Sequence, residues 1–188
     1  MDPFVQTDRL ALRRFTAQDA DLLIELDSGP AVMRFLTGGQ PTEPAAAVRE
    51  RVPPRVLATY DMWDGRFGLF AAYATDSGAF IGWFQLRPEP GGPPDEIELG
   101  YRLRQDAWGN GYATEGSRAL LGKALSELDV RVVCGATLSV NVASQKVMER
   151  AGMTVAEALP LQRTCSWSRA LNPAASRYGI TREQWEQR

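Results

Sequence analysis

The sequence predicts a mixed α/β sheet within a single domain over residues 1–188, and three observations lead to this fold class. The length of 188 residues is a little more than one typical domain and too short for two well-cored ones. The hydrophobic fraction of 44% and the charged fraction of 23% are those of a globular chain. The predicted elements run from one strand through two helices to three successive strands, and then alternate helix with strand. That order fits a mixed sheet rather than a doubly wound parallel one.

The first elements are a strand and a capped helix. Residues 7–14 alternate leucines with charged neighbours, which is typical of a half-buried strand. Thr16 and Asp19 have the spacing of a capping box, and this predicts a helix that carries apolar residues as far as Leu26. Gly29 with the proline that follows it is expected to end this helix.

A short apolar turn and an interrupted helix are predicted next. Residues 32–36 are mostly apolar and precede a pair of glycines, so we expect a turn there. Thr42 is placed to cap a helix over residues 43–52. The two prolines at residues 53–54 interrupt that helix, and a further helical piece is expected over residues 55–63.

Three strands follow in close succession. Residues 67–74 and 79–86 are predicted to form a hairpin around the Asp-Ser-Gly turn at residues 76–78. Residues 87–95 form a proline- and glycine-rich loop. Residues 97–103 then alternate apolar side chains with Glu98, Gly100 and Arg102, and so predict a strand with two different faces.

The remaining elements alternate helix with strand. Apolar residues at helical spacing predict a long helix over residues 114–128, which packs one stripe on a sheet. Residues 131–140 predict the next strand, and Asn141 is placed to cap the helix that follows. The remainder predicts a strand pair around residues 164–171 and 175–181.

Composition excludes several functional classes. The chain has no histidine, which removes Ser-His-Asp and Cys-His catalysis and histidine-bound zinc. Cys134 and Cys165 are far apart and form no metal-ligand spacing, so we expect no metal site. The net charge of −2 argues against a general nucleic-acid partner. No apolar run approaches the roughly 18 residues of a membrane span, and the first residues do not resemble a secretion signal, so we expect a cytoplasmic protein with no membrane partner.

The most informative segment is residues 104–116, which read RQDAWGNGYATEG. Gly109 and Gly111 lie between a predicted strand and a predicted helix, where glycine allows positive φ angles and lets backbone amides approach a ligand. The amides in the first turn of the following helix have no internal partner, and the helix dipole adds partial positive charge. The segment therefore predicts a site for a phosphate or diphosphate that needs neither metal nor imidazole.

Other interpretations of this loop remain open at this stage. A plain tight turn from strand to helix would use the same glycines. A dinucleotide-binding fingerprint needs a third glycine where Thr114 stands, and a Walker loop needs a Gly-Lys-Ser/Thr sequence that is absent.

Four segments resemble the GNAT superfamily of N-acetyltransferases, in the branch of the RimJ/RimL-like ribosomal-protein N-acetyltransferases. The residues QDAWGNGYATE at 105–115 are similar to its acetyl-CoA loop, and TDRLALR at 7–13 to its opening strand. The residues NVASQKVMERAG at 141–152 are similar to its N-x-x-S-x-x-V-M-E-K-x-G helix, and RYGITREQW at 177–185 to its closing strand. The resemblance covers nearly the whole chain in the right order.

The resemblance implies a central, twisted, mostly antiparallel sheet of about seven strands, with acetyl-CoA held where the strand at 97–103 splays from the strand at 131–140. The pantetheine arm would bond to the backbone near Tyr101, Arg102 and Leu103. The diphosphate would bind the amides of Trp108, Gly109, Asn110, Gly111, Tyr112, Ala113 and Thr114. Asn141 would contact the cofactor arm, although a simple helix N-cap explains it equally well.

The resemblance also suggests catalytic residues. Glu98 is the candidate base, because it lies on the polar side of the strand that would flank the thioester and some members use a strand glutamate in this way. Glu96 on the same face is the alternative, and both are also explained as solvated positions of an alternating strand. Many relatives protonate the departing CoA with a tyrosine where this chain has Met148, so that role does not carry over. Ser144 occupies the place of a serine proposed to assist the thiolate, and a helix-capping role explains it as well.

The expected activity is direct transfer of an acetyl group from acetyl-CoA to a primary amine, either a protein N-terminal α-amine or a small-molecule amine. A noncatalytic acyl-CoA-binding or sensing module is the alternative. A generic nucleotide-binding domain, which would prefer ATP or NAD to CoA, is a third interpretation. The sequence leaves a homodimer open.

Overall fold

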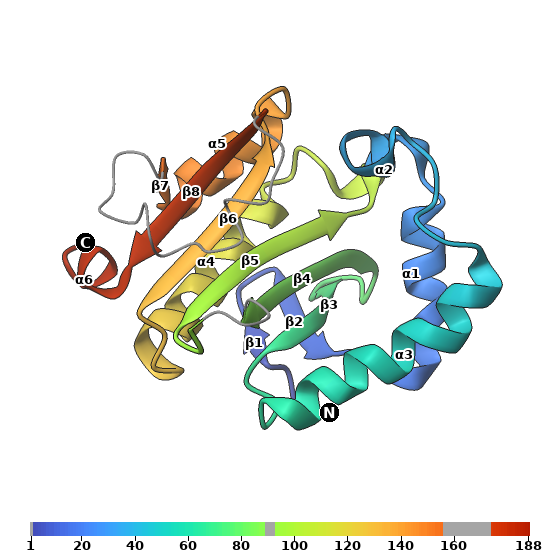
Figure 1. The fold of residues 1–188 in the computed structure, drawn as a ribbon, viewed down its shortest axis with the longest axis horizontal. Coiled ribbons are helices and arrows are strands. Elements are labelled where there is room, and N and C mark those ends of the chain that lie inside the picture. The colour runs from blue at the N-terminus through green and yellow to red at the C-terminus, as the bar shows by residue number, and fades with distance from the viewer. Residues whose placement is uncertain (1, 89–92, 156–173) are drawn as a thin grey trace. The chain divides into compact units, whose positions relative to one another are not determined.

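The computed structural model describes residues 2–88, 93–155 and 174–188. Its strands form one mixed sheet of eight strands in the order β1-β2-β3-β4-β5-β6-β8-β7, flanked by helices (Figure 1). The chain divides into two compact units, one with residues 1–85 and 101–113 and one with residues 86–100 and 114–188. That residues 1–188 form a single domain stays a prediction.

The first unit contains the strands β1 (Val5–Gln6), β2 (Leu10–Arg14) and β3 (Gly68–Ala74), paired antiparallel. The register places Leu12 opposite Ala72 and Arg13 opposite Ala71. Since side chains alternate between faces, the leucines of β2 enter the core on one face while Arg13 emerges on the other. The alternation in the sequence is thus confirmed for β2.

Helix α1 (Ala20–Asp27) follows a single 3₁₀ turn, η1 (Ala17–Asp19), and the predicted capping box is confirmed. The amide and the hydroxyl of Thr16 donate to the Asp19 carboxylate at 2.7 and 2.9 Å. This carboxylate also accepts two bonds from Arg13, at 2.8 and 2.9 Å, so the turn is fixed to strand β2.

The predicted apolar turn at residues 32–36 is wrong, because these residues lie in helix α2 (Pro30–Thr37). Pro30 occupies the first turn, where its missing N–H costs nothing, and Gly38 ends the helix with a φ of 72°. The two ends were therefore marked in the sequence by a proline and a glycine at the positions that helices favour.

The predicted interruption at residues 53–54 is also wrong, since α3 (Ala45–Met62) runs through both prolines. The helix starts after Pro44 rather than after Thr42. Each proline removes one donor, and the carbonyls that lose a partner belong to Arg49 and Glu50, which are exposed to water. Burial of side chains along α3, from Val48 to Tyr60, outweighs the low helix propensity of the two prolines.

Strands β4 (Phe80–Pro88) and β5 (Glu96–Leu103) each begin in one unit and end in the other. Within the first unit, the turn η2 (Gln105–Ala107) follows β5 and leads toward helix α4 (Tyr112–Glu127). The predicted strands and the long helix are confirmed with small shifts in their ends.

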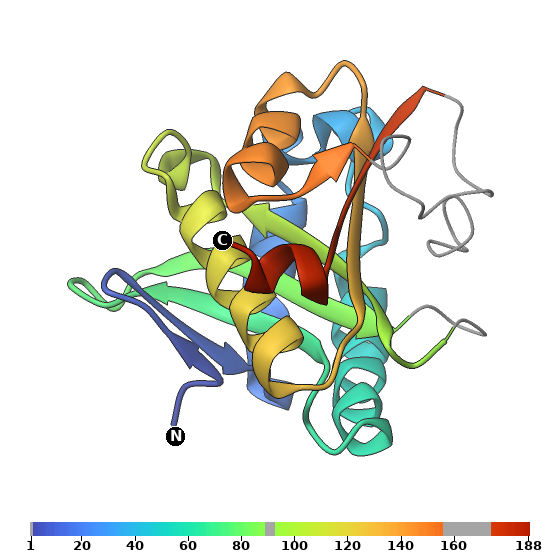
Figure 2. The same cartoon turned by 90° about the vertical axis from the view of Figure 1, so that its left-hand side faces the viewer.

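The second unit contains β6 (Val132–Leu138), β7 (Thr154–Val155) and β8 (Ala175–Thr181), with helices α5 (Val142–Ala151) and α6 (Arg182–Glu186). Strand β5 pairs parallel with β6 over Glu96–Glu98 only, although both strands continue. Figure 2 shows α5 (orange) beside the paired strands β6 and β8. Residues 164–171, one half of the predicted strand pair, lie outside the described residues, whereas the other half is β8.

The core of each unit is apolar. Leu10, Phe70 and Phe84 are fully buried in the first unit, and Leu120 and Val133 in the second. In the part of the chain that the structure describes, no helix has the length and apolar character needed to cross a bilayer.

Candidate functional site

The loop between η2 and α4 has the glycine geometry that the sequence predicted. Gly109 and Gly111 adopt φ angles of 80° and 81°, in the left-handed region that residues with a Cβ rarely occupy. A Cβ added at Gly109 would meet no heavy atom within 4 Å, so the loop faces open space at this residue. The glycines are therefore required by the backbone conformation and not by close packing.

The loop leaves a set of backbone amides without partners. Within the described residues, no hydrogen bond is found from the amides of Gly109, Gly111 or the first three residues of α4. The Trp108 amide differs, because it donates to the Gln105 carbonyl at 3.2 Å. Free amides at a helix N-terminus form a site suited to an anion.

Side chains bind the carbonyl groups of the same segment. The Asn110 amide group donates to the carbonyls of Ala107 and Trp108 at 3.3 and 3.2 Å. The Trp108 indole donates to the Leu103 carbonyl at 3.0 Å. These bonds occupy the carbonyl oxygens of Ala107, Trp108 and Leu103, which are then less available to face a ligand.

Arg9 contacts this loop, and the sequence analysis assigned it no role. Its Nη1 donates to the Asn110 carbonyl at 2.9 Å, and its Cζ lies 5.0 Å from the centre of the Tyr112 ring. The sequence signal was its place in the segment 7–13, which resembles the family's opening strand.

The end of β5 belongs to the first unit together with the loop. Leu103 is buried, and the ring of Tyr101 packs near that of Phe84 with 5.9 Å between their centres. The Arg102 guanidinium pairs with Asp27 of α1 and lies 5.0 Å from the Trp83 ring centre. The side chain of Arg102 is thus engaged within this unit. A contact between Arg102 and the cofactor would therefore come from its backbone.

In the second unit, the two glutamates of β5 have different environments. Glu98 accepts a hydrogen bond from Arg87 at 2.7 Å, and 20% of its side chain is exposed. Glu96 is paired with Arg131 at 2.7 Å with 7% of its side chain exposed. Burial raises the pKa of the Glu96 carboxyl, although Arg131 acts in the opposite direction. Of the two, Glu98 has the better access to water and to a ligand.

The start of α5 is capped by Asn141, whose Oδ1 accepts from the Ser144 amide at 3.3 Å. The helix-cap explanation of Asn141 is thus confirmed. Its backbone amide donates to the Leu138 carbonyl at 2.8 Å, and its side-chain Nδ2 has no hydrogen bond within the described residues. Met148 is buried against Gly135, where an added Cβ would lie 3.2 Å from the Met148 Cε. The side chain at this place is therefore apolar and offers no proton.

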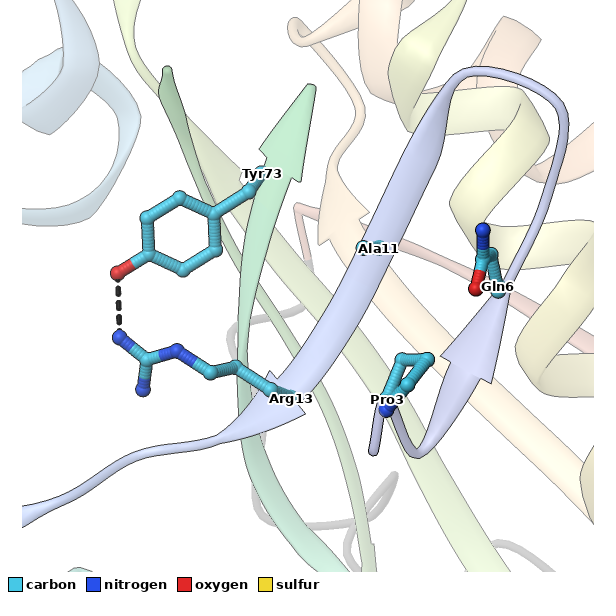
Figure 3. Close-up of a pocket in the computed structure, with 5 residues that line it drawn as sticks. All are labelled: Pro3, Gln6, Ala11, Arg13 and Tyr73. Carbon is cyan, nitrogen blue, oxygen red and sulfur yellow. Dashed lines mark hydrogen bonds between the residues drawn. The ribbon is translucent and has the colours of Figure 1, made fainter. Parts of the chain in front are cut away.

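Two cavities in the first unit lie apart from the loop. One, of about 390 Å³, is lined by Pro3, Gln6, Ala11, Arg13 and Tyr73 (Figure 3). Its arginine is held by Asp19 and by the Tyr73 hydroxyl, so its charge is already matched. The other, of about 400 Å³, adjoins the end of α1 and the start of α3 and contains the carboxylates of Asp27 and Glu43.

The described residues contain no group of three side chains suited to hold a metal ion. The free amides of the loop fit a diphosphate group.

Comparison with known proteins decides the family. Residues 9–154 match the family model described as an acetyltransferase (GNAT) domain. The chain belongs to the GNAT acetyltransferase family. It is thus an acetyltransferase, and its cosubstrate is acetyl-CoA.

One curated relative and two solved structures illustrate the likeness. FsC-acetyl coenzyme A-N(2)-transacetylase of Aspergillus fumigatus is 31% identical over 189 residues, which cover 97% of this chain and 78% of the relative. An acetyltransferase structure from Agrobacterium tumefaciens has a TM-score of 0.73 at 24% identity, covering 95% of this chain and 94% of that one. The structure of RimL, a ribosomal L7/L12 α-N-protein acetyltransferase in complex with CoA, has a TM-score of 0.71 at 16% identity, covering 93% and 95%. These structures share the fold, and membership of the ribosomal-protein branch stays a prediction.

Proposed function

We propose that this GNAT protein transfers the acetyl group of acetyl-CoA directly to a primary amine of the α-amino type, on a small molecule or a peptide N-terminus. The observation that carries the proposal is the likeness to a transacetylase whose name specifies N(2) as the acceptor atom, at 31% identity over 97% of this chain.

The cofactor is proposed to bind along β5 and the glycine loop. The backbone of Tyr101, Arg102 and Leu103 would take the pantetheine arm, and the amides from Gly109 to Thr114 the diphosphate. The Trp108 amide, which has a partner in Gln105, is left out of this set. Bound acetyl-CoA supplies a thioester as the acyl donor.

An α-amine suits this site because it needs little help to lose its proton. At pH 7, an amine with a pKa near 7.7 is about 15% neutral, whereas a lysine amine near 10.4 is only about 0.04% neutral. Deprotonation therefore costs about 1 kcal/mol for the first and about 4–5 kcal/mol for the second. A single carboxylate acting through water is enough for the α-amine, and holding the reactants together supplies much of the rest.

Glu98 is proposed as that carboxylate. Its partial exposure gives it access to water, and the hydrogen bond from Arg87 holds its carboxylate in place. Glu96 fits the role less well, because Arg131 and the surrounding chain enclose it.

The departing thiolate is proposed to receive little help from a side chain. Met148, which stands where many relatives have a tyrosine, carries no proton to donate. Ser144, in the first turn of α5, remains the candidate hydrogen-bond donor to the thiolate. Asn141 would contact the cofactor arm through its side-chain Nδ2.

The cavity beside α1 contains carboxylates whose charge is already matched. Its volume of about 400 Å³ is in the range of small-molecule sites, and it carries two carboxylates. Asp27 is paired with Arg102 and accepts from the Thr42 hydroxyl at 3.2 Å, and Glu43 is paired with Arg51. These neighbours already balance the charge of both carboxylates, so this cavity does not by itself indicate a cationic acceptor.

The test is an acceptor panel with mass spectrometry of the products. Purified protein and acetyl-CoA are incubated with α-amino amides, short peptides, polyamines and aminoglycosides. The proposal predicts singly acetylated products on α-amines, with release of an equal amount of CoA. Acetylation of side-chain amines in preference to α-amines would contradict it. Tight binding of acetyl-CoA without turnover of any amine would instead favour the noncatalytic module.

A further inference from the structure

The guanidinium of Arg9 contacts three successive residues of the glycine loop. Its Nη1 donates to the Asn110 carbonyl at 2.9 Å. A Cβ added at Gly111 would lie 3.4 Å from its Nη2, and its Cζ lies 5.0 Å from the centre of the Tyr112 ring. An exposed arginine 101 residues away in sequence thus borders the loop that carries the free amides.

The hydrogen bond to Asn110 determines where the next amide points. The carbonyl of Asn110 and the N–H of Gly111 belong to one planar trans peptide unit, so they point in opposite directions. When Arg9 holds the carbonyl, the Gly111 N–H is fixed on the other side of the loop. Without Arg9, this peptide unit is free to rotate, because glycine accepts many backbone angles, and its carbonyl oxygen could then face a phosphate and repel it.

We propose that Arg9 is a positioning residue for acetyl-CoA, which fixes the Gly111 peptide so that its N–H faces the diphosphate. The inference rests on the proposed placement of the diphosphate at this loop. Arg9 acts from the opposite side of the peptide unit and through it, and it need not touch the cofactor.

The test compares ligands with and without a diphosphate. Calorimetry measures binding of CoA and of pantetheine, which lacks the diphosphate, to the wild type and to Arg9→Met, Arg9→Lys and Arg34→Met. Arg34 is a matched control, because it is also exposed and lies 5.2 Å from an aromatic ring, that of Phe35.

Arg9→Met is expected to weaken CoA binding about 10-fold or more and to leave pantetheine binding unchanged, since a charge-assisted hydrogen bond is lost. Arg9→Lys is expected to restore much of the affinity, and Arg34→Met to match the wild type. An Arg9→Met protein that binds CoA as the wild type does would overturn the inference. Equal affinity of the wild type for CoA and pantetheine would instead overturn the placement of the diphosphate.

Arg177 lies on β8 in the second unit. Its neighbour Tyr178 faces α5, since the Tyr178 hydroxyl bonds to Gln145 and Glu149. Arg177 therefore points to the opposite face of the sheet. Glu98 lies on the same face as Arg177. Gly135 packs on α5, so its neighbour Cys134 faces away from α5, and Glu98 pairs with Cys134.

The guanidinium of Arg177 lacks a partner although it is partly enclosed. The residue is half-buried, and its Nε is buried without a hydrogen bond. Among the described residues, none forms an ion pair or hydrogen bond with its side chain, in contrast to the paired Arg87 and Arg131. A polar group buried without a partner is costly, and a bound water, ion or ligand can account for it.

We propose that Arg177 binds a carboxylate of the acceptor, which deepens the proposed α-amine acetylation and rests on it. From Glu98 to Arg177 the sheet spans two strand spacings and two residues, about 12 Å between Cα atoms. An acceptor that reaches both groups has to bridge this span, and a short peptide has an α-amine at one end and a carboxylate at the other. The acceptor class is therefore a short peptide or peptide-like amine with a free carboxylate.

The test uses a panel of X-Gly dipeptides and their C-terminal amides, which have similar α-amines. Wild-type protein is expected to show a KM for the dipeptides about 10-fold or more below that for the amides, and Arg177→Met to abolish this difference with little change in kcat for the amides. Arg177→Lys should restore part of it, and Arg150→Met, at an exposed position of α5, should not change it. Equal KM values for dipeptides and amides in the wild type would overturn the inference while leaving α-amine acetylation intact. Absence of acetylation on every dipeptide and amide would overturn both.

Discussion

Replacing Gly109 with alanine isolates the contribution of the loop conformation to cofactor binding. With a φ of 80°, an alanine costs about 1–2 kcal/mol, and no neighbour within 4 Å adds a clash. The backbone relieves the strain by rotating, which turns an amide away from the diphosphate. A hydrogen bond to a charged group is worth about 1.5–3 kcal/mol, so losing one raises the Kd for CoA by about 10- to 150-fold.

Gly78→Ala is the matched control for this experiment. Gly78 lies in the turn between β3 and β4, with a φ of 68° and no heavy atom within 4 Å of an added Cβ. Both variants should therefore lose similar stability, with the melting temperature falling by about 2–4 °C per kcal/mol. Calorimetric titration with CoA, alongside thermal melting, separates strain from binding. The reasoning is refuted if folded Gly109→Ala binds CoA as tightly as Gly78→Ala does.

Three further variants test the chemistry and the stability of the protein. Glu98→Gln should lower turnover by about 100-fold and leave the affinity for CoA similar. The loss should be largest at low pH, where the amine is protonated, and a variant with the pH–rate profile of the wild type would exclude Glu98 as the base. Asp19→Asn tests the acid limb of stability: burial raises the pKa of Asp19, but hydrogen bonds from Arg13 and Thr16 outweigh it and hold the pKa below its usual value. The wild type therefore gains stability above pH about 4 and loses it as the pH falls further. In urea unfolding, the variant should be less stable than the wild type by about 1–3 kcal/mol at pH 7, and the two stabilities should converge in acid. A gap that stays constant with pH would contradict that assignment. Tyr60→Phe removes the buried hydroxyl that accepts from the Phe15 amide at 2.9 Å, which should cost about 1–3 kcal/mol, and an unchanged melting temperature in calorimetry would contradict this.

Sequence reasoning succeeded where the signal is local. The alternation of residues 97–103 predicted β5, and the spacing of Thr16 and Asp19 predicted the capping box, because both patterns depend on residues a few positions apart. The glycine loop was predicted for the same reason, since positive φ at Gly109 and Gly111 is a property of the loop itself.

The misses have other physical causes. Helix α2 is short, and its apolar residues were too few to show a helical period, although Pro30 and Gly38 marked its ends. Helix α3 continues through two prolines because burial of its apolar side offsets the lost donors. Strands β1 and β7 have two residues each, which is too short for a periodic pattern.

The site could be predicted in part. Its backbone donors followed from the loop, but its side-chain partners did not, because they come together only in the folded chain. Arg9 meets Asn110 across 101 positions, and Arg87 meets Glu98 from a neighbouring strand. No periodicity in the sequence carries such pairings, since they depend on strand order and register.

A crystal structure of the protein with bound CoA tests the central claim most directly. The account predicts diphosphate oxygens at about 2.7–3.1 Å from the backbone nitrogens of Gly109 and Gly111, with Arg9 still bonded to the Asn110 carbonyl. A diphosphate bound elsewhere, with those nitrogens donating to other groups of the protein, would contradict the account.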